Sequence, residues 1–238
     1  MLFRSVVVTG GSFVYNGSPR TATASVSGLG TGITQTVTWS YSGSCTSAPT
    51  TVAEGTSCSA KATYAGDANH FGSNDDDPIT ITQAPATISF SSLTKTYNGT
   101  AQSPTVTTSP TGLSFSSTGY PQTNANNTPG YAVTATINNP NYVATTTSNT
   151  FVINPAPVTA TAGGGSSVYD GSTKTPAACV VTGTYKGDLT CTNNPATVGP
   201  GVSTTTTVPV VAGTGLSNFA ITSVNGSYAI SKIGRAHV

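Results

Sequence analysis

The sequence predicts an all-β protein built from repeated small modules. Thr, Ser, Gly, Val and Asn dominate its 238 residues, and the stiff side chains of Thr and Val favour pleated strands. Apolar and polar residues alternate at a period of two, and no window has the spacing of an amphipathic helix. A Tyr-Asx-Gly motif returns after 82 and then after 72 residues. Intervals of this length are those of a small domain repeated in tandem.

The Tyr-Asx-Gly motif is the clearest internal repeat. Asn-Gly and Asp-Gly are the preferred pairs of a two-residue type I′ hairpin, because both central positions need a positive φ. We therefore predict a glycine hairpin in each module, with the tyrosine ring packed inward. The residues of this structural turn are Tyr15, Asn16, Gly17, Tyr97, Asn98, Gly99, Tyr169, Asp170 and Gly171.

A second motif, an Asn followed by a ring, supports the same alignment. It stands twelve residues before an Ile of the closing strand three times, as Asn69-His70, Asn141-Tyr142 and Asn218-Phe219. We predict module 1 over residues 6–84, module 2 over 85–155 and module 3 over 156–232. Short proline-containing stretches join them, and because proline stiffens φ we expect the modules to form a rod.

Each module is expected to contain several alternating strands. Residues 37–41 place large side chains on one face and hydroxyls on the other, which predicts a half-buried strand with Trp39 at the centre of the core. The predicted strands cover residues 6–9, 21–26, 37–41, 60–64 and 79–81 in module 1, 88–90, 131–137 and 151–153 in module 2, and 158–162, 204–211 and 228–230 in module 3.

The composition argues against two classes of partner. Charged residues make up 6% of the chain, with eight Lys and Arg against seven Asp and Glu. Solubility therefore comes from hydroxyl and amide groups, which is usual for β-rich extracellular modules. Steering toward nucleic acid or an anionic membrane needs a basic face, and the sequence has none. We expect no nucleic-acid partner and no membrane contact by this segment.

The two ends of the chain differ from the rest. Residues 1–5 and 233–238 resemble translated sequencing adaptor, because codons for one end are the reverse complement of codons for the other. We expect these ends to be non-native and residues 6–232 to be an internal, metagenomic fragment. The alternative is that they are genuine terminal residues. A fragment says nothing of a signal peptide or an anchor in its parent.

The motifs together resemble those of a known family. Tyr-Asx-Gly near the start, Asn-ring later and closing strands at 151–155 and 228–232 are similar to bacterial MBG/YDG-type immunoglobulin-like repeats. The resemblance spans residues 6–232 and is best in modules 2 and 3, while residues 62–69 resemble a related Gly-Asp-Ala-Asn type. It implies tandem β-sandwiches in large secreted or surface-anchored bacterial proteins, often adhesins. It implies no catalytic residue.

The four cysteines are predicted to form two disulfides. Each close pair lies inside one module and module 2 has no cysteine, so we expect Cys45–Cys58 and Cys179–Cys191. Loops of this length contribute about 3 kcal/mol each in the chain-entropy model. Zinc binding is the competing interpretation, but no Cys-x-x-Cys and no second histidine accompany the cysteines.

Other candidate sites are weak. Asp75, Asp76 and Asp77 supply hard oxygen ligands for calcium, yet they lack the spacing of a calcium loop, and a solvated loop before Ile79 is the plainer interpretation. His70 stands where Tyr142 and Phe219 stand, so we expect it to fill the same packing position rather than to act as a base. No nucleophile elbow and no carboxylate pair repeated across the modules appear. We predict no catalysis, no metal and no cofactor.

The predicted function is that of a structural spacer, or stalk, in an extracellular or cell-surface adhesin-like protein. Any surface ligand would then be bound by other parts of the parent protein. One alternative is a carbohydrate- or protein-binding module that uses loops or exposed aromatics such as Tyr41, Tyr120 or Tyr142. Another is an accessory repeat region of a secreted hydrolase. A contiguous exposed aromatic patch on one module would favour binding over the spacer.

Overall fold

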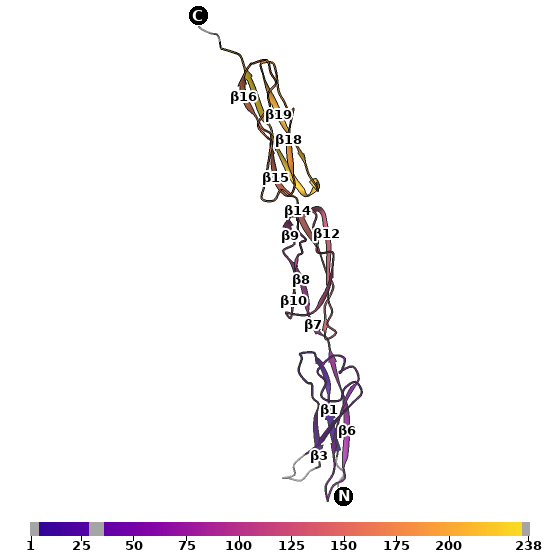
Figure 1. Ribbon diagram of the computed structural model, residues 1–238. Coiled ribbons are helices and arrows are strands. Elements are labelled where there is room, and N and C mark those ends of the chain that lie inside the picture. The colour runs from indigo at the N-terminus through magenta and orange to yellow at the C-terminus, as the bar shows by residue number, and fades with distance from the viewer. Residues whose placement is uncertain (1–4, 29–35, 235–238) are drawn as a thin grey trace. The chain divides into compact units, whose positions relative to one another are not determined.

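The computed structural model describes residues 5–28 and 36–234 and is all-β (Figure 1). Within these ranges the one helical element is a short 3-10 turn, η1 (Leu216–Asn218), and no helix is long and apolar enough to cross a membrane. Residues 1–4 and 235–238 lie outside the described ranges. Most of the predicted adaptor sequence, residues 1–5 and 233–238, is therefore outside them as well.

The chain divides into two compact units. Unit 1 takes its described residues from Met1–Ser89, Val106–Ser117 and Ala135–Thr147, and unit 2 from Phe90–Thr105, Thr118–Thr134 and Ser148–Val238. Both units draw on residues 85–155, so the division into three modules stays a prediction.

The N-terminal part of unit 1 is a β-sandwich. One sheet pairs β1 (Ser5–Thr9) antiparallel with β3 (Thr23–Ser27), and the other has the order β2-β6-β5-β4. The bounds of the second sheet are β2 (Gly11–Val14), β6 (Ser73–Thr82), β5 (Cys58–Tyr64) and β4 (Thr38–Ser42). Alternation places Val6 and Val8 of β1 against Ala60, Ala62 and Ile79 of the facing sheet, and these residues form one buried core.

The prediction that Trp39 is the centre of this core is wrong. Trp39 is 38% exposed, and the fully buried positions of the sheet lie on β5 and β6 instead. The reason is the strand order, because β4 is the edge strand and β5 separates it from β6. Its neighbour Tyr41 is half-buried and packs against the edge of the core.

The middle of the chain forms three further sheets, with orders β10-β8, β13-β7 and β11-β12-β14-β9. Val133, Phe151 and Ile153 are the fully buried residues of the core in this part of unit 2. The strands are β7 (Ala84–Pro85), β8 (Thr87–Ser91), β9 (Thr94–Thr96), β10 (Thr105–Ser109), β11 (Phe115–Thr118), β12 (Asn126–Ile137), β13 (Tyr142–Val143) and β14 (Thr147–Asn154).

The C-terminal part of unit 2 again contains two sheets, with orders β17-β15-β20 and β16-β21-β19-β18. Val158 and Ala160 of β15 are buried with Leu189 and Phe219. The strands are β15 (Ala156–Thr161), β16 (Gly165–Val168), β17 (Val180–Thr182), β18 (Thr190–Asn194), β19 (Ser203–Ala212), β20 (Phe219–Val224) and β21 (Gly226–Ser231).

One parallel pairing recurs along the chain. The strand that precedes each Tyr-Asx-Gly motif pairs parallel with the strand that closes the same predicted module, as β2 with β6, β9 with β14 and β16 with β21. Between closing and opening strands only Gln83 separates β6 from β7, and only Pro155 separates β14 from β15. The closing strand therefore continues almost directly into the next opening strand.

Candidate functional site

The tyrosines of the three motifs occupy equivalent positions. Each tyrosine donates its backbone N–H, at 2.9 Å, to the carbonyl of the last residue of the parallel closing strand. The pairs are Tyr15 with Thr82, Tyr97 with Asn154 and Tyr169 with Ser231. This bond extends the parallel ladder by one step, so the motif begins at the same structural point each time.

The following residues form an Asx turn rather than the predicted hairpin. The side-chain Oδ1 of Asn16, Asn98 or Asp170 accepts the backbone N–H two residues on, at 3.0 Å in all three cases. Only the glycine has positive φ, with values of 78°, 77° and 80°. A type I′ turn needs positive φ at both central residues, so that prediction is wrong. The preceding strand is parallel to its neighbour, and a turn after it therefore has no adjacent antiparallel strand to enter.

In unit 1 the Tyr-Asx-Gly turn contacts the second motif, Asn141-Tyr142. The Tyr15 and Tyr142 rings meet edge to face with centroids 5.3 Å apart. Asn141 Oδ1 accepts the backbone N–H of Val52 at 2.9 Å. Tyr142 opens β13 and pairs with Ala84, directly after the closing strand of module 1. The tyrosine therefore packs against the next predicted module and not into its own core.

In unit 2 the same groups meet again. The Tyr97 ring lies edge to face against Phe219, with centroids 5.4 Å apart, and against Tyr185 at 5.6 Å. Asn218 Oδ1 accepts the backbone N–H of Ala125 at 2.7 Å. Phe219 opens β20 and pairs with Ala156, as Tyr142 pairs with Ala84. Two contacts therefore repeat as a set: turn tyrosine to motif ring, and loop N–H to motif asparagine.

A third feature places the loop N–H. The fifth residue after the turn tyrosine donates its backbone N–H to a carbonyl of the loop. The residue whose N–H bonds the motif asparagine lies three positions after that carbonyl. Arg20 bonds Pro49 at 2.9 Å, ahead of Val52, and Gln102 bonds Gln122 at 2.8 Å, ahead of Ala125. The turn and the loop are thus tied together at one end of each predicted module.

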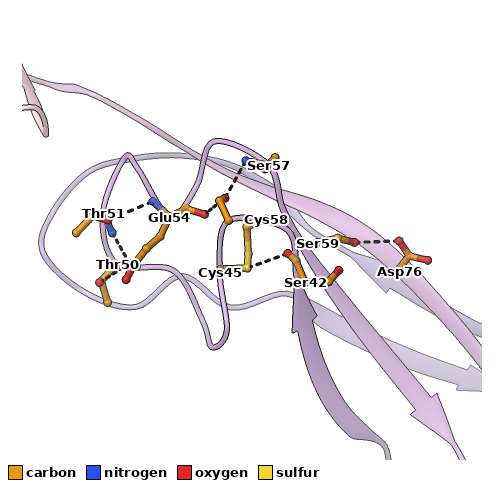
Figure 2. The surroundings of a disulfide bond; sticks show 10 residues. Ser42, Cys45, Thr50, Thr51, Glu54, Ser57, Cys58, Ser59 and Asp76 are labelled. Atoms are coloured by element: carbon orange, nitrogen blue, oxygen red, sulfur yellow. Dashed lines mark hydrogen bonds between the residues drawn. A yellow bond between two sulfur atoms is a disulfide. The ribbon is translucent and has the colours of Figure 1, made fainter.

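The loop that carries Val52 is held by a disulfide and one carboxylate (Figure 2). Cys45 and Cys58 are bonded, with Cα atoms 5.2 Å apart. Glu54 Oε2 accepts the backbone N–H of Thr50 at 2.7 Å, the Thr50 hydroxyl at 2.7 Å and the backbone N–H of Thr51 at 3.0 Å. Thr51 Oγ1 in turn accepts the backbone N–H of Glu54 at 3.3 Å. This reciprocal Thr-x-x-Glu pattern is that of a capping box.

The bonds to Glu54 favour its charged form. The backbone and side-chain hydrogen bonds from Thr50, followed by the backbone bond from Thr51, lower the pKa of Glu54 from 4.5 to about 2. The ionised carboxylate therefore holds the backbone N–H groups of Thr50 and Thr51, directly before Val52, whose own N–H bonds Asn141.

The second disulfide joins Cys179 to Cys191, with Cα atoms 5.5 Å apart, and the described residues contain no free cysteine. Both pairs are those expected from the spacing. Since a zinc site needs free thiolates, the disulfides leave no place for the zinc interpretation.

The acidic run is part of a strand, so the interpretation of Asp75, Asp76 and Asp77 as a solvated loop is wrong. All three lie within β6 and point alternately to opposite faces. Asp75 Oδ2 accepts the N–H of Val8 at 2.9 Å and Asp77 Oδ2 accepts the N–H of Gly10 at 2.8 Å. Asp76 instead accepts the Ser59 hydroxyl at 2.9 Å.

These carboxylates therefore bond backbone groups rather than converge. Asp75 accepts an N–H group of β1, and Asp77 accepts the N–H group of Gly10, which directly follows β1. Among the residues that the structure describes, no group of three or more His, Cys, Asp or Glu side chains is arranged to hold a metal ion.

His70 differs from the rings at the matching positions. Tyr142 and Phe219 open strands and pack on a turn tyrosine, whereas His70 forms an isolated bridge with Asp67 and its Nδ1 lies 2.5 Å from Asp67 Oδ1. The expectation that His70 fills the same packing position stays a prediction, because Tyr142 and Phe219 each pack on the turn tyrosine of the preceding predicted module. The Tyr64 hydroxyl, the Asn69 backbone N–H and His70 lower the pKa of Asp67 from 3.8 to about 2.

The aromatics suggested for ligand binding are all half-buried. Tyr41 packs on the core of unit 1, Tyr142 packs on Tyr15, and Tyr120 lies edge to face against Phe90 at 6.2 Å. Sequence reasoning missed that the Tyr15 and Tyr97 rings contact a ring of the next predicted module, while the inward packing that it predicted holds for Tyr97, which also packs against Val133, Phe151 and Ile153. The signal was present, because Tyr-Asx-Gly and Asn-ring recur together.

Part of the chain is similar to a known protein family. Residues 86–157 match the family model of the MBG domain. A search of solved structures lists the "Crystal structure of Dscam1 isoform 6.9, N-terminal four Ig domains", with a TM-score of 0.27 and 9% identity over 98% of this chain and 73% of that chain. A search of curated proteins found no match.

Proposed function

We propose, from the match of residues 86–157 to the MBG domain family, that this chain belongs to a bacterial extracellular or cell-surface repeat protein. In this proposal residues 6–84, 85–155 and 156–232 are three tandem immunoglobulin-like modules. They act as a structural spacer, or stalk, in an adhesin-like protein, and they perform no catalysis.

The observation that carries the proposal is the repeated contact set. A spacer has to resist bending where one module meets the next, and an ordinary flexible linker does not do this. Here a single residue separates the strands at each predicted junction, and a ring pair and an asparagine hydrogen bond recur beside it. A tyrosine paired with an aromatic ring, and an asparagine that accepts a loop N–H, recur at both predicted junctions. This recurrence is expected if the junctions have to be stiff.

The disulfides support the proposed location. Disulfide bonds persist in oxidising surroundings such as the cell surface and are rare in the cytosol. Both bonds close loops of modules that bury modest cores, where such a bond contributes a large share of stability. Tyr41, Tyr120 and Tyr142, the aromatics suggested for the binding alternative, are each half-buried and do not supply an exposed aromatic patch.

Small-angle X-ray scattering of the full chain tests the spacer. Stacked modules of roughly 30–40 Å each predict an extended particle. Tyr15→Ala and Tyr97→Ala remove the ring contacts and should lower the measured maximum dimension and broaden its distribution. Tyr169→Ala is the matched control, because it changes the same turn without removing a described ring contact. A compact particle, or equal profiles for Tyr97→Ala and Tyr169→Ala, would refute the proposal.

A further inference from the structure

The last turn tyrosine is presented without the contacts that the other two make. Tyr169 is 39% exposed, whereas Tyr15 and Tyr97 are half-buried against Tyr142 and Phe219. No ring contact to Tyr169 lies within the described residues. Its backbone bond to Ser231 and the Asx turn that follows are the same as in the other copies. The turn is therefore formed and oriented, and its ring surface is open.

The loop beside Tyr169 presents the second group of the set. Lys174, five residues after Tyr169, donates its N–H to the carbonyl of Val198 at 2.8 Å, as Gln102 does to Gln122. Three residues after Val198 lies Gly201, the equivalent of Val52 and Ala125, whose N–H groups bond the motif asparagines. Gly201 is exposed, no atom lies within 4 Å of where its Cβ would be, and its N–H makes no hydrogen bond within the described residues.

We infer that the Tyr169 turn and the Gly201 loop form a docking surface for the Asn-ring end of another module of the same type. The incoming asparagine accepts the Gly201 N–H, and the following ring packs edge to face on Tyr169. Both contacts have two precedents in this chain, at the same sequence offsets. The occupant is thus a protein module that carries Asn-Tyr or Asn-Phe.

The spacing of the chain is compatible with a module linked in tandem. Ala84 and Ala156 each lie two residues after the residue that bonds the turn tyrosine, and each pairs with the motif ring residue. The corresponding position after Ser231 is 233. A further module whose opening strand starts there would carry its Asn-ring motif to Tyr169 by the same geometry. This inference rests on the proposed tandem repeat but not on its role as a spacer.

The test extends the full chain. A second copy of residues 156–232 is joined directly after Lys232, so that the copied Ala156 takes position 233. The readouts are amide hydrogen exchange at Gly201 and the rate of nitration of Tyr169 by tetranitromethane, each compared with the unextended chain. We expect the Gly201 amide to exchange at least roughly tenfold more slowly and Tyr169 to be nitrated more slowly. Asn218→Ala in the added copy alone should restore fast exchange at Gly201.

A matched control and a second extended chain keep the result decisive. Asn218→Ala in the original copy acts at Ala125 and should leave the protection of Gly201 unchanged. Appending residues 84–154 instead brings Asn141-Tyr142 to the same place, so the test does not depend on the folding of one added copy. Unchanged exchange at Gly201 and unchanged nitration of Tyr169 in both extended chains would overturn the docking surface while leaving the spacer untouched. Protection of Gly201 in a chain that scatters as a compact particle would refute the spacer and support the docking.

Discussion

Replacing the turn glycines by alanine separates backbone strain from the contact that the turn makes. Gly17, Gly99 and Gly171 have φ values of 78°, 77° and 80°, so each substitution places an L-residue in the same left-handed conformation. That conformation costs about 1–2 kcal/mol. Backbone strain alone should therefore lower the stability by the same amount at all three sites.

The space around the glycines is not equal. A Cβ at Gly99 would lie 1.9 Å from Tyr185 Oη and 2.7 Å from its Cζ, whereas at Gly17 the nearest atom is Tyr15 Oη at 3.8 Å and at Gly171 none lies within 4 Å. Relief at Gly99 requires the Tyr185 ring to move, but that ring stacks on Phe219 at 6.2 Å and contacts Tyr97. Overpacking of this kind typically adds about 1–3 kcal/mol.

We therefore expect Gly17→Ala and Gly171→Ala to cost about 1–2 kcal/mol each and Gly99→Ala about 2–5 kcal/mol. Residue-resolved amide hydrogen exchange on the full chain measures the free energy of opening near each turn separately, which a single melting temperature of a multi-unit chain does not. Equal losses of stability at all three sites would refute the reasoning, because the clash of an added Cβ at position 99 with Tyr185 would then cost nothing.

Three further predictions concern the carboxylates and the disulfides. The pKa of Glu54 is lower in the folded protein, about 2 against 4.5, so its contribution to stability is present above pH 4.5 and is lost as the pH falls toward 2. Glu54→Gln should therefore flatten the pH dependence of the unfolding temperature of unit 1, followed by the fluorescence of Trp39, the single tryptophan of the chain, and an unchanged slope would contradict this. Reducing both disulfides should cost about 3 kcal/mol around each one and leave amide exchange in β12 and β14 unchanged, whereas equal loss there would count against the loop-entropy argument. Asp77→Ala leaves the Gly10 N–H without its acceptor and should cost about 1–3 kcal/mol in urea unfolding, against under about 0.5 kcal/mol for Asp76→Ala; a reversed order would show that the Gly10 N–H is satisfied in another way.

Much of the fold could be predicted because its signals are local. Alternation over residues 60–64 and 228–230 marked strands that the structure has as parts of β5 and β21. The disulfide pairs were predictable for the same reason, since the partners lie 13 and 12 residues apart. In each case a short stretch of chain already contains the interaction.

The errors came where a distant strand decides the outcome. The pattern around Trp39 is that of a half-buried strand, but the place of β4 at the sheet edge depends on β5 and β6. The acidic residues 75–77 have low strand propensity, yet Val8 and Gly10 supply N–H groups that their carboxylates satisfy. The turn at Asn16-Gly17 follows from a parallel strand partner 68 residues away in sequence, since Val14 pairs with Thr82.

The sequence by itself determined which residues repeat: the Tyr-Asx-Gly and Asn-ring motifs, the disulfide pairs and the strands with clear alternation, such as those at 60–64 and 228–230, follow from spacing within tens of residues. Only the tertiary structure decided what the repeats contact. The Tyr15 ring lies against Tyr142, and the Tyr97 ring lies against Phe219, across predicted module boundaries. The physical reason is that a ring contact between residues more than a hundred positions apart is set by the packing of whole sheets, and no local pattern records it.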